Sequence, residues 1–322
     1  MAIVLREYGG AETLRFESIR VAAPGPEEVR LRQTAIGVNF HDIYVRTGLY
    51  KTLKLPGIPG LDAVGVVEAV GTRVQHLKPG DRVAYITAAY GAYAEERLIA
   101  ADRLLHLPNE IDDRTAAATL VRGLTVWMLL AKVHPVKSNG RYLVHAAAGG
   151  VGRLLCQWAT HLGAHVIGTA GSEQKAAVAL QAGCKEVILY RQENFSQRVR
   201  DLTQGQGVDA VFDSVGKDTF DGSLECLALR GHLVNFGQSS GPVEPFAVSR
   251  LAEKSNTLSR PILFHYIEDP MERAAMANHV FEALRSGTIV PDIGAQYALR
   301  DAAQAHRALE MRASTGSTIL LP

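Results

Sequence analysis

The sequence is poor in cysteine, carries no block of one charge and lacks the marks of a membrane or nucleic-acid-binding protein. Its three cysteines, Cys156, Cys184 and Cys226, are odd in number and widely spaced, which predicts reduced structural thiols. Lysine and arginine are scattered and the net charge is +1, so nucleic acid is disfavoured as the main ligand. The run 154–172 has no formal charge, but its polar side chains and glycines argue against a membrane span.

Length, composition and the first residues indicate a water-soluble enzyme with more than one domain. A chain of 322 residues, with 47% hydrophobic and 21% charged residues, can bury two sizeable cores. Residues 1–7 lack the basic region and the long apolar core of a secretory signal. The sequence contains no internal repeat and no low-complexity segment. We therefore expect a cytoplasmic protein.

Glycine is concentrated where a phosphate-binding turn would lie. The apolar run 142–145 is followed by the sequence AAAGGVG at 146–152 and by an apolar-periodic stretch that ends at Gly163. A strand, a glycine turn and a helix in this order let the backbone approach a pyrophosphate and aim helix N–H groups at it. Ala146 stands where the common fingerprint has its first glycine. We expect a dinucleotide to contact Ala148, Gly149, Gly150, Val151 and Gly152.

Strand-like and helical segments alternate after this turn. Such alternation predicts an α/β domain with a parallel, doubly wound sheet, which we place at residues 124–260. The expected strands are 165–170, 186–190, 208–215 and 232–236, and the expected helices are 173–181, 195–204 and 219–229.

The first 120 residues have a different organisation. Short strand-like runs, such as 29–32 and 63–70, are separated by turns rich in proline and glycine, which suggests a β-rich, barrel-like domain. Residues 112–115 cap a long helix at 116–132 that leads into the second domain. A last helix at 271–285 and the segment 317–321 are expected to return to the first domain. The expected division is therefore 1–123, 124–260 and 261–322.

Several segments resemble the medium-chain dehydrogenase/reductase superfamily, namely 65–71, 78–83, 146–152, 213–216 and 235–241. Within this superfamily, residues 39–50 are similar to the zinc-independent quinone oxidoreductases, the group of bacterial NADPH:quinone reductase and ζ-crystallin. The resemblance covers essentially the whole chain. It implies a GroES-like β-rich catalytic domain, a Rossmann NADPH-binding domain, a cleft between them and commonly a homodimer.

The zinc ligands of related alcohol dehydrogenases are missing from the sequence. Those enzymes present a cysteine near the position of Gly37, a His-Glu pair near Leu61 and Asp62, and a lobe with four cysteines. Zinc needs several Cys, His or carboxylate ligands that converge on one point. We therefore predict that the protein has no metal site.

Without a metal, the favoured reaction is reduction of an acceptor that is already electrophilic. Hydride addition to a quinone gives a phenolate, which is a far weaker base than an alkoxide and can be stabilised by hydrogen bonds. In the resembling family, the residues that match Asn39 and Tyr44 line the quinone side of the nicotinamide. We expect them to orient the quinone and to bond its oxyanion. The alternative is that Tyr44 packs by its ring and Asn39 caps a local turn.

Two neighbouring residues leave alternatives open. Tyr50 can form a wall of the pocket or lie on the surface. His41 replaces an apolar residue that we would expect from the family, and we expect it to be solvated or locally bonded rather than to donate a proton.

The segment after the second strand favours NADPH over NADH. An NAD site usually ends this strand with a carboxylate for the ribose 2′-OH, but here it ends at Gly171 and Ser172. Ser172 is expected to cap the next helix, which puts Lys175 in its first turn, against the helix dipole. Pairing with a 2′-phosphate would explain this lysine, although Glu173 is a mild objection and a solvated lysine is the alternative. By resemblance, Ser172, Lys175 and Tyr190 match phosphate-contacting positions.

The nicotinamide end of the cofactor is assigned to the carboxyl ends of two further strands. Ligands of doubly wound sheets bind on that side, so we expect contacts from Ser214, Phe236, Gly237 and Ser239, with Phe236 as plain core the alternative. The family counterpart of Thr125 approaches the nicotinamide. A backbone hydrogen bond within its own helix is the alternative for Thr125.

The favoured function is hydride transfer from NADPH to a small-molecule quinone without metal or flavin. The same fold and cofactor also suit reduction of an activated C=C, such as an enone or a 2-enoyl thioester, with Tyr44 as the proton donor. A non-catalytic, NADPH-binding structural protein is the third possibility. The size of the quinone and the physiological acceptor are not determined by the sequence.

Overall fold

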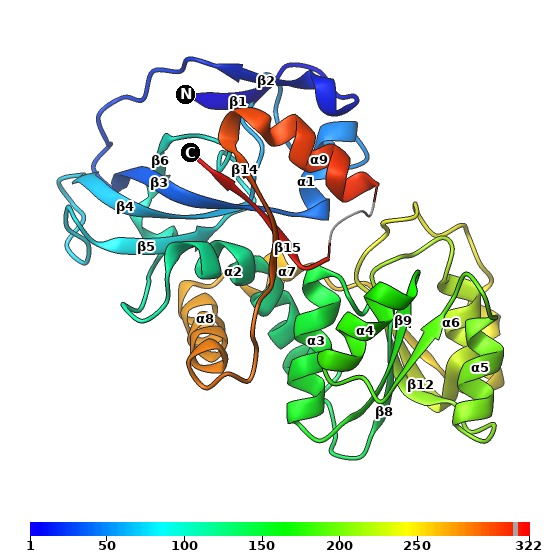
Figure 1. The fold of residues 1–322 in the computed structure, drawn as a ribbon. Coiled ribbons are helices and arrows are strands. Elements are labelled where there is room, and N and C mark those ends of the chain that lie inside the picture. Colours follow the sequence, from blue (N-terminus) through cyan, green and yellow to red (C-terminus); the bar gives the residue numbers. More distant parts are fainter. Residues whose placement is uncertain (312–314) are drawn as a thin grey trace. The chain divides into compact units, whose positions relative to one another are not determined.

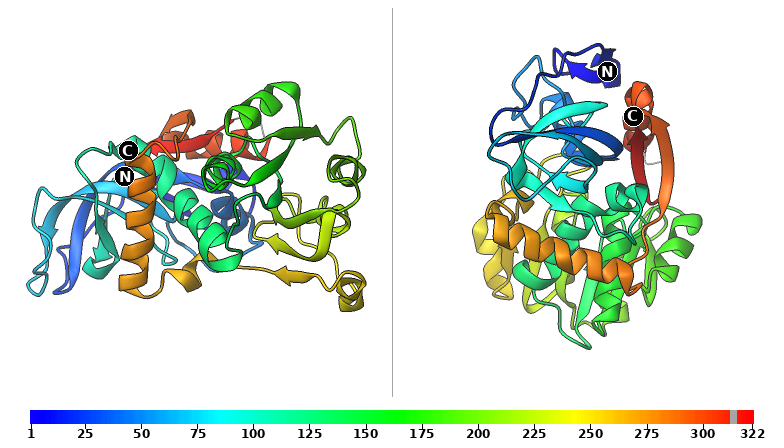
Figure 2. Two further views of the ribbon diagram at one scale, coloured as in Figure 1. Left: turned by 90° about the horizontal axis from the view of Figure 1, so that it is seen from below. Right: turned by 90° about the vertical axis from the view of Figure 1, so that its left-hand side faces the viewer.

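The computed structural model describes residues 1–311 and 315–322, and the chain forms two compact units. The first unit contains both chain ends, which lie near each other (Figures 1 and 2). It consists of Met1–Arg122, Ile267–Arg285 and Pro291–Pro322, and the second unit consists of Gly123–Tyr266 and Ser286–Val290.

Two short segments of the chain belong to a different unit than we expected. Residues 261–266 and Ser286–Val290 join the second unit, whereas the sequence suggested that everything after residue 260 returns to the first. Two hydrogen bonds join Ser286–Val290 to Gln157 of the second unit. The Val290 N–H donates to the Gln157 Oε1 at 2.9 Å, and the Gln157 Nε2 donates to the Val290 carbonyl oxygen at 3.3 Å.

The first unit is built on a seven-stranded sheet around the long strand β3 (Glu28–Val38), which pairs with β4, β6 and β15. In its first half, Val29, Leu31 and Gln33 are buried and alternate with more exposed residues, as expected for a strand with one solvated face. The β-rich, GroES-like domain is thus confirmed. Its other strands are β4 (Asp62–Val70), β5 (Arg82–Ile86), β6 (Glu96–Ala100), β7 (Leu104–His106), β14 (Ile293–Ala298) and β15 (Ser317–Leu321), and β1 (Ala2–Leu5) pairs with β2 (Leu14–Glu17).

The end of the chain returns to this sheet, as the sequence predicted. β15 runs antiparallel to β3, with Ile319 opposite Gly37. The predicted helix at 271–285 is α8 (Pro270–Arg285). Two elements between them, β14 and α9 (Ala302–Glu310), were not predicted.

The helix that leads into the second unit is α2 (Asp113–Trp127), continued by a π-helical run at Met128–Val133. It begins three residues before the expected position, and the Asp112 carboxylate accepts a hydrogen bond from the Thr115 N–H at 2.9 Å. Within the described residues, 113–133 is the one helical stretch long and apolar enough to cross a membrane. It is 67% buried over its most apolar window, as a core helix would be.

The second unit is a doubly wound parallel sheet, which confirms the Rossmann architecture. Its strand order is β10-β9-β8-β11-β12-β13, with α3 and α4 on one face and α5 and α6 on the other (Figure 1). The strands are β8 (Arg141–Val144), β9 (His165–Ala170), β10 (Glu186–Leu189), β11 (Val208–Asp213), β12 (Leu227–Asn235) and β13 (Thr257–Ser259). The helices are α3 (Gly150–His161), α4 (Glu173–Gln181), α5 (Phe195–Leu202), α6 (Phe220–Cys226) and α7 (Leu263–Tyr266).

Two helices of this unit are shorter than predicted. The helix expected at 219–229 ends at Cys226, because Leu227 pairs with Val208 of β11 and starts β12. The helix expected to reach residue 204 ends at Leu202, and Gln204 has a φ of 53°, outside the right-handed helical region.

The backbone geometry of the glycine turn shows which of its positions require glycine. Ala146 has a φ of 51°, a left-handed conformation that is strained for a residue with a side chain. A Cβ at position 152 would lie 2.3 Å from the Ala146 carbonyl oxygen. A Cβ at position 149 would meet the same oxygen at 3.2 Å and nothing closer. Close packing of the turn on α3 therefore depends on Gly152.

We predict that Gly152→Ala destabilises the protein by about 1–3 kcal/mol, although alanine favours helices, because backbone atoms must move to admit the methyl group. Gly149→Ala is the matched control and should cost less than about 1 kcal/mol. Urea unfolding of both variants, without added cofactor, measures the difference. Equal stability of the two variants would show that the turn relaxes freely.

Candidate functional site

In the first unit, the predicted residues Asn39 and Tyr44 lie on the short helix α1 (Phe40–Thr47) or at its start. The helix starts after Asn39, whose backbone N–H donates to the Asp42 Oδ2 at 2.7 Å. It ends at Gly48, which has a φ of 79°. The sequence analysis did not predict this helix, which positions both side chains.

The amide of Asn39 binds a residue from a distant strand. Its Nδ2 donates to the Asp62 Oδ1 at 2.8 Å, and both side chains are buried. The alternative that Asn39 caps a local turn therefore accounts for only part of its contacts, because its amide nitrogen donates to a residue of β4.

Buried charges surround this hydrogen bond. Burial raises the pKa of Asp62 to about 7, against the positive charge of Arg122 and the hydrogen bond from Asn39. Burial likewise raises the pKa of Asp42 to about 8. Arg122 donates to the carbonyl oxygens of Val38 and Ala118, at 2.6 and 2.9 Å. Sequence reasoning missed all three charged residues, although a charge beside the apolar run 63–67 is a usable signal for Asp62.

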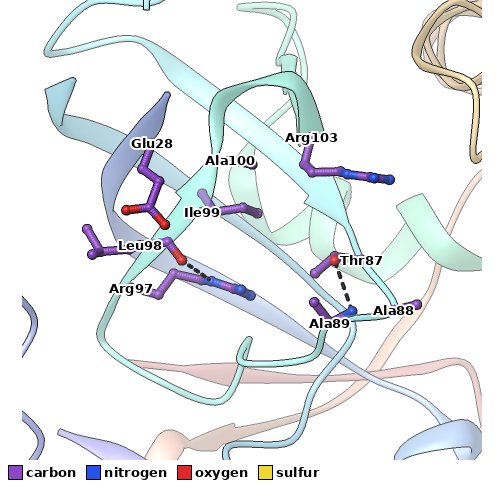
Figure 3. A pocket seen from close by; sticks show the side chains of 9 residues that line it. All are labelled: Glu28, Thr87, Ala88, Ala89, Arg97, Leu98, Ile99, Ala100 and Arg103. Atoms are coloured by element: carbon purple, nitrogen blue, oxygen red, sulfur yellow. Dashed lines mark hydrogen bonds between the residues drawn. The ribbon is translucent and has the colours of Figure 1, made fainter. Parts of the chain in front are cut away.

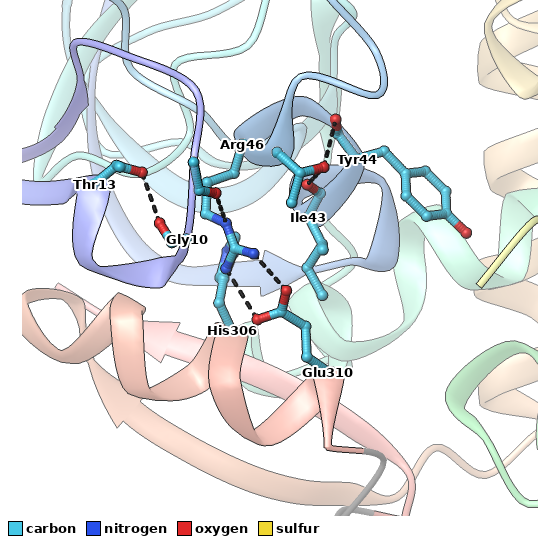
Figure 4. A network of polar contacts seen from close by, with 9 residues as sticks. Gly10, Thr13, Ile43, Tyr44, Arg46, His306 and Glu310 are labelled. Atoms are coloured by element: carbon cyan, nitrogen blue, oxygen red, sulfur yellow. Dashed lines mark hydrogen bonds and ion pairs between the residues drawn. The ribbon is translucent and has the colours of Figure 1, made fainter. Parts of the chain in front are cut away.

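A directed chain of hydrogen bonds leads from α9 to the start of α1. Figure 4 shows its first part, where Arg46 lies beside His306 and Glu310. Arg46 pairs with Glu310, and its Nη1 lies 3.4 Å from the His306 Nδ1. The His306 Nε2 lies 3.0 Å from the Tyr93 hydroxyl, which donates to the Asp42 Oδ2 at 3.2 Å. Since arginine only donates, Nδ1 of His306 must accept and Nε2 must carry the proton. Burial and the neighbouring Arg46 lower the pKa of His306 to about 3, so this ring stays neutral.

In Figure 4 the ring of Tyr44 points away from Arg46 and Glu310. The ring belongs to an aromatic cluster. Its centroid lies 5.1 Å from that of Tyr50 and 5.7 Å from that of Phe40. Tyr50 also packs edge-on against His41 at 5.3 Å. We call Phe40, His41, Tyr44, Tyr50 and Tyr90 the aromatic cluster.

His41 is half-buried and makes a hydrogen bond to a residue distant in the sequence, which the sequence analysis did not predict. Its Nε2 lies 3.2 Å from the hydroxyl of Tyr90, 49 residues away. Burial lowers the pKa of His41 to about 4, so it is neutral at pH 7. The sequence analysis missed this contact because Tyr90 lies in a distant loop, and no local pattern predicts that this loop packs against α1.

In the second unit, the predicted cofactor residues gather at the carboxyl ends of the strands. The turn after β8 contains Ala148 and Gly149, and Gly150, Val151 and Gly152 form the first turn of α3. N–H groups in a first helical turn have no partner within the helix, so they are open to an anion.

The next two strand ends bring together the residues expected at the 2′-phosphate. The Ser172 hydroxyl accepts from the Lys175 N–H at 3.4 Å, which confirms Ser172 as the cap of α4. β9 and β10 are parallel neighbours, with Ala170 opposite Leu189. Tyr190 consequently lies against Gly171, where a Cβ would be 2.7 Å from its hydroxyl.

The ends of β11 and β12 hold the remaining predicted residues. The Asp213 Oδ1 accepts from the Val215 N–H at 2.8 Å and shapes the turn that contains Ser214. A Cβ at Gly237 would lie 2.5 Å from the Ser214 carbonyl oxygen, and the Ser239 N–H donates to that oxygen at 3.2 Å. Phe236 is half-buried rather than plain core, and Thr125 is a half-buried residue of α2.

A pocket of about 350 Å³ in the first unit contains none of the predicted residues (Figure 3). Within it, the Arg97 Nε donates to the Leu98 carbonyl oxygen at 3.2 Å. The Ala89 N–H donates to the Thr87 hydroxyl at 3.1 Å. We therefore do not assign the function to this pocket. It is lined by Glu28, Thr87, Ala88, Ala89, Arg97, Leu98, Ile99, Ala100 and Arg103.

Comparison with known proteins assigns the whole chain to a protein family. Residues 25–109 match the alcohol dehydrogenase GroES-like domain, and residues 150–280 match the zinc-binding dehydrogenase family. A quinone oxidoreductase of Pseudomonas aeruginosa is 46% identical, with 98% of this chain and 97% of the relative covered. The chain belongs to the quinone oxidoreductases of the medium-chain dehydrogenase/reductase superfamily.

Two further likenesses bear on the reaction of this quinone oxidoreductase family member. The structure of Escherichia coli quinone oxidoreductase complexed with NADPH has a TM-score of 0.97 and 44% identity, and covers 100% of this chain and 99% of its own. A 2-haloacrylate reductase of Burkholderia is 40% identical, with 100% of this chain and 99% of the relative covered.

We predict that His306→Gln makes stability less sensitive to acid. The folded-state pKa of about 3 lies below that of an exposed histidine, so the unfolded chain binds a proton as pH falls below about 6.5 and stability is lost. Glutamine can accept from Arg46 and donate to Tyr93 without titrating. Between pH 7 and 4.5 the variant should therefore lose about 2–3 kcal/mol less than the wild type.

Urea unfolding at the two pH values measures this difference. His161→Gln, the same change at an exposed residue, is the control and should follow the wild type. Parallel losses in wild type and His306→Gln would mean that His306 is not held neutral.

Proposed function

We propose that this protein reduces quinones with NADPH by direct hydride transfer, without metal or flavin. The observation that carries the proposal is the pair Asn39 and Tyr44 on α1, in a chain that is similar over its full length to quinone oxidoreductases. Tyr44 offers a phenolic hydroxyl within the aromatic cluster, whose flat rings suit a flat quinone.

The cofactor would be held by the strand ends of the second unit. The fit rests on Gly152 and Gly237, where backbone approaches too closely for any side chain. We propose that residues 148–152 bind the pyrophosphate and that Ser214, Phe236, Gly237 and Ser239, with Thr125, face the nicotinamide. Gly171, Ser172, Lys175 and Tyr190 would bind the 2′-phosphate.

The first unit would supply binding and hydrogen bonds. NADPH, when bound, supplies the hydride. Asn39 and Tyr44 would bond the quinone oxygens and stabilise the phenolate charge as it develops. His41 takes no proton-donating role, because burial keeps it neutral and its Nε2 is engaged by Tyr90.

Metal-free chemistry is supported by how Asp62 fills the space beside Gly37. A Cβ at position 37 would lie 2.4 Å from the Asp62 Oδ2, so a ligand side chain cannot project there while Asp62 keeps its place. Within residues 1–311 and 315–322, no group of three or more His, Cys, Asp or Glu side chains could hold an ion.

Reduction of an activated C=C is a second candidate. It is favoured by the likeness to a 2-haloacrylate reductase, whose named substrate has a C=C conjugated to a carboxylate. In that reaction a carbon must be protonated, and Tyr44 is the proton donor we would assign.

We further propose that the protein is cytoplasmic and that it works as a homodimer; the family resemblance implies the homodimer. The sheet of the second unit supports this assembly, because β13 at its edge pairs on one side only within the described residues. A second copy could extend that edge.

The assignment of the 2′-phosphate predicts that Lys175→Ala weakens NADPH binding about ten- to a hundredfold and leaves NADH nearly unchanged. A charge-assisted hydrogen bond to phosphate contributes roughly 1.5–3 kcal/mol. Lys185→Ala removes the same charge at the amino-terminal end of β10, away from the carboxyl ends of the strands, and should change neither affinity. Calorimetric titration decides, and equal wild-type affinities for NADPH and NADH would refute the assignment.

The two candidate reactions predict different effects of Tyr44→Phe. A quinone needs only hydrogen bonds, so kcat/KM should fall about tenfold. An enone or enoyl thioester also needs a proton on carbon, so the loss should be on the order of a hundred- to ten-thousandfold. We expect 1,4-benzoquinone to be the best substrate in a panel with a 2-alkenal and an enoyl-CoA, followed by NADPH absorbance. Faster turnover of enoyl-CoA than of any quinone would favour the second candidate.

A further inference from the structure

The contact between Asn39 and Asp62 has no role in the function proposed so far. Both side chains are buried, with 8% and 0% of their surface exposed. The Asn39 Nδ2 donates to the Asp62 Oδ1 at 2.8 Å, whereas the Asp62 Oδ2 has no hydrogen-bond partner within the described residues. The carboxylate is kept in this place by the absence of a side chain at Gly37.

The charge of Asp62 decides which end of the amide can face it. An ionised carboxylate only accepts hydrogen bonds, whereas an amide has a donating nitrogen and an accepting oxygen. The nitrogen of Asn39 must therefore face Asp62 while Asp62 is ionised. Arg122, whose positive charge favours the ionised form, supports this orientation.

We propose that Asp62 is a positioning residue for quinone reduction: it accepts one N–H of the Asn39 amide and leaves the second N–H for the quinone oxygen. This inference rests on the proposed function. A protonated Asp62 can donate to the amide oxygen instead. The amide of Asn39 can then rotate so that its oxygen faces Asp62, and its second N–H no longer points to the quinone oxygen.

Several ionisable groups surround Asp62 and enter any pH dependence. They are Asp42 on α1, Arg122 on α2, Tyr85 on β5 and Tyr93 in the loop before β6. Asp42 is the useful comparison, because it is also buried and feels the same arginine. Asp42 binds the backbone N–H of Asn39, whereas Asp62 binds its side chain.

The kinetic test compares Asp62→Asn with Asp42→Asn, using 1,4-benzoquinone and NADPH between about pH 6 and 8. In the wild type, kcat/KM should rise with pH as Asp62 ionises, since burial puts its pKa at about 7. Asp62→Asn should lose this rise and fall about tenfold at the upper end of that range, with the Kd for NADPH unchanged. Asp42→Asn should keep the rise. A pH profile of Asp62→Asn that parallels the wild type would overturn the proposal.

The second test is spectroscopic and needs no turnover. The side-chain ¹⁵N and ¹H signals of Asn39, assigned by their loss in Asn39→Ser, should titrate in the wild type with a midpoint at the pKa of Asp62, about 7. In Asp62→Asn the transition near pH 7 should be lost, which leaves only a shift near pH 8, where the neighbouring Asp42 ionises. Signals that do not titrate in the wild type would overturn the proposal even if Asp62→Asn failed to fold. If the wild type reduces no quinone, the proposed function fails. This titration still shows whether the ionisation of Asp62 determines the orientation of the Asn39 amide.

Discussion

The arrangement of the first unit depends on the buried hydrogen-bond chain that runs from Arg46 through His306 and Tyr93 to Asp42. Its direction is fixed at one end, because a guanidinium can only donate, and at the other end the Asp42 Oδ2 accepts from the Tyr93 hydroxyl. Every link is buried, so a broken link would leave an unpaired polar group away from water. Through this chain, a helix near the C-terminus sets where Asn39 and α1 lie.

A second constraint is the space shared by Gly37 and Asp62. The missing side chain at one position is filled by the carboxylate of the other. The same carboxylate then occupies the volume of a possible metal ligand and binds the amide of Asn39.

The sequence predicted the second unit well because its signals are local. The cap at Ser172, the turn at 146–152 and the strand ends each depend on residues a few positions apart. Parallel strand order then brings these ends to one edge. The side-chain contacts of the first unit were not predicted, because they join residues that are distant in the sequence. Asp62 is 23 residues from Asn39, and His306 is 260 residues from Arg46. No period or motif reports such pairs.

This difference also separates what the two units can determine. The cofactor residues that we propose in the second unit would act largely through backbone N–H groups and through glycines that admit close approach, so they would recognise a group common to many dinucleotide enzymes. The first unit offers side chains whose orientation depends on buried charge, as Asn39 depends on Asp62. Substitutions that alter buried charge around α1 should therefore change acceptor preference and pH dependence before they change cofactor affinity.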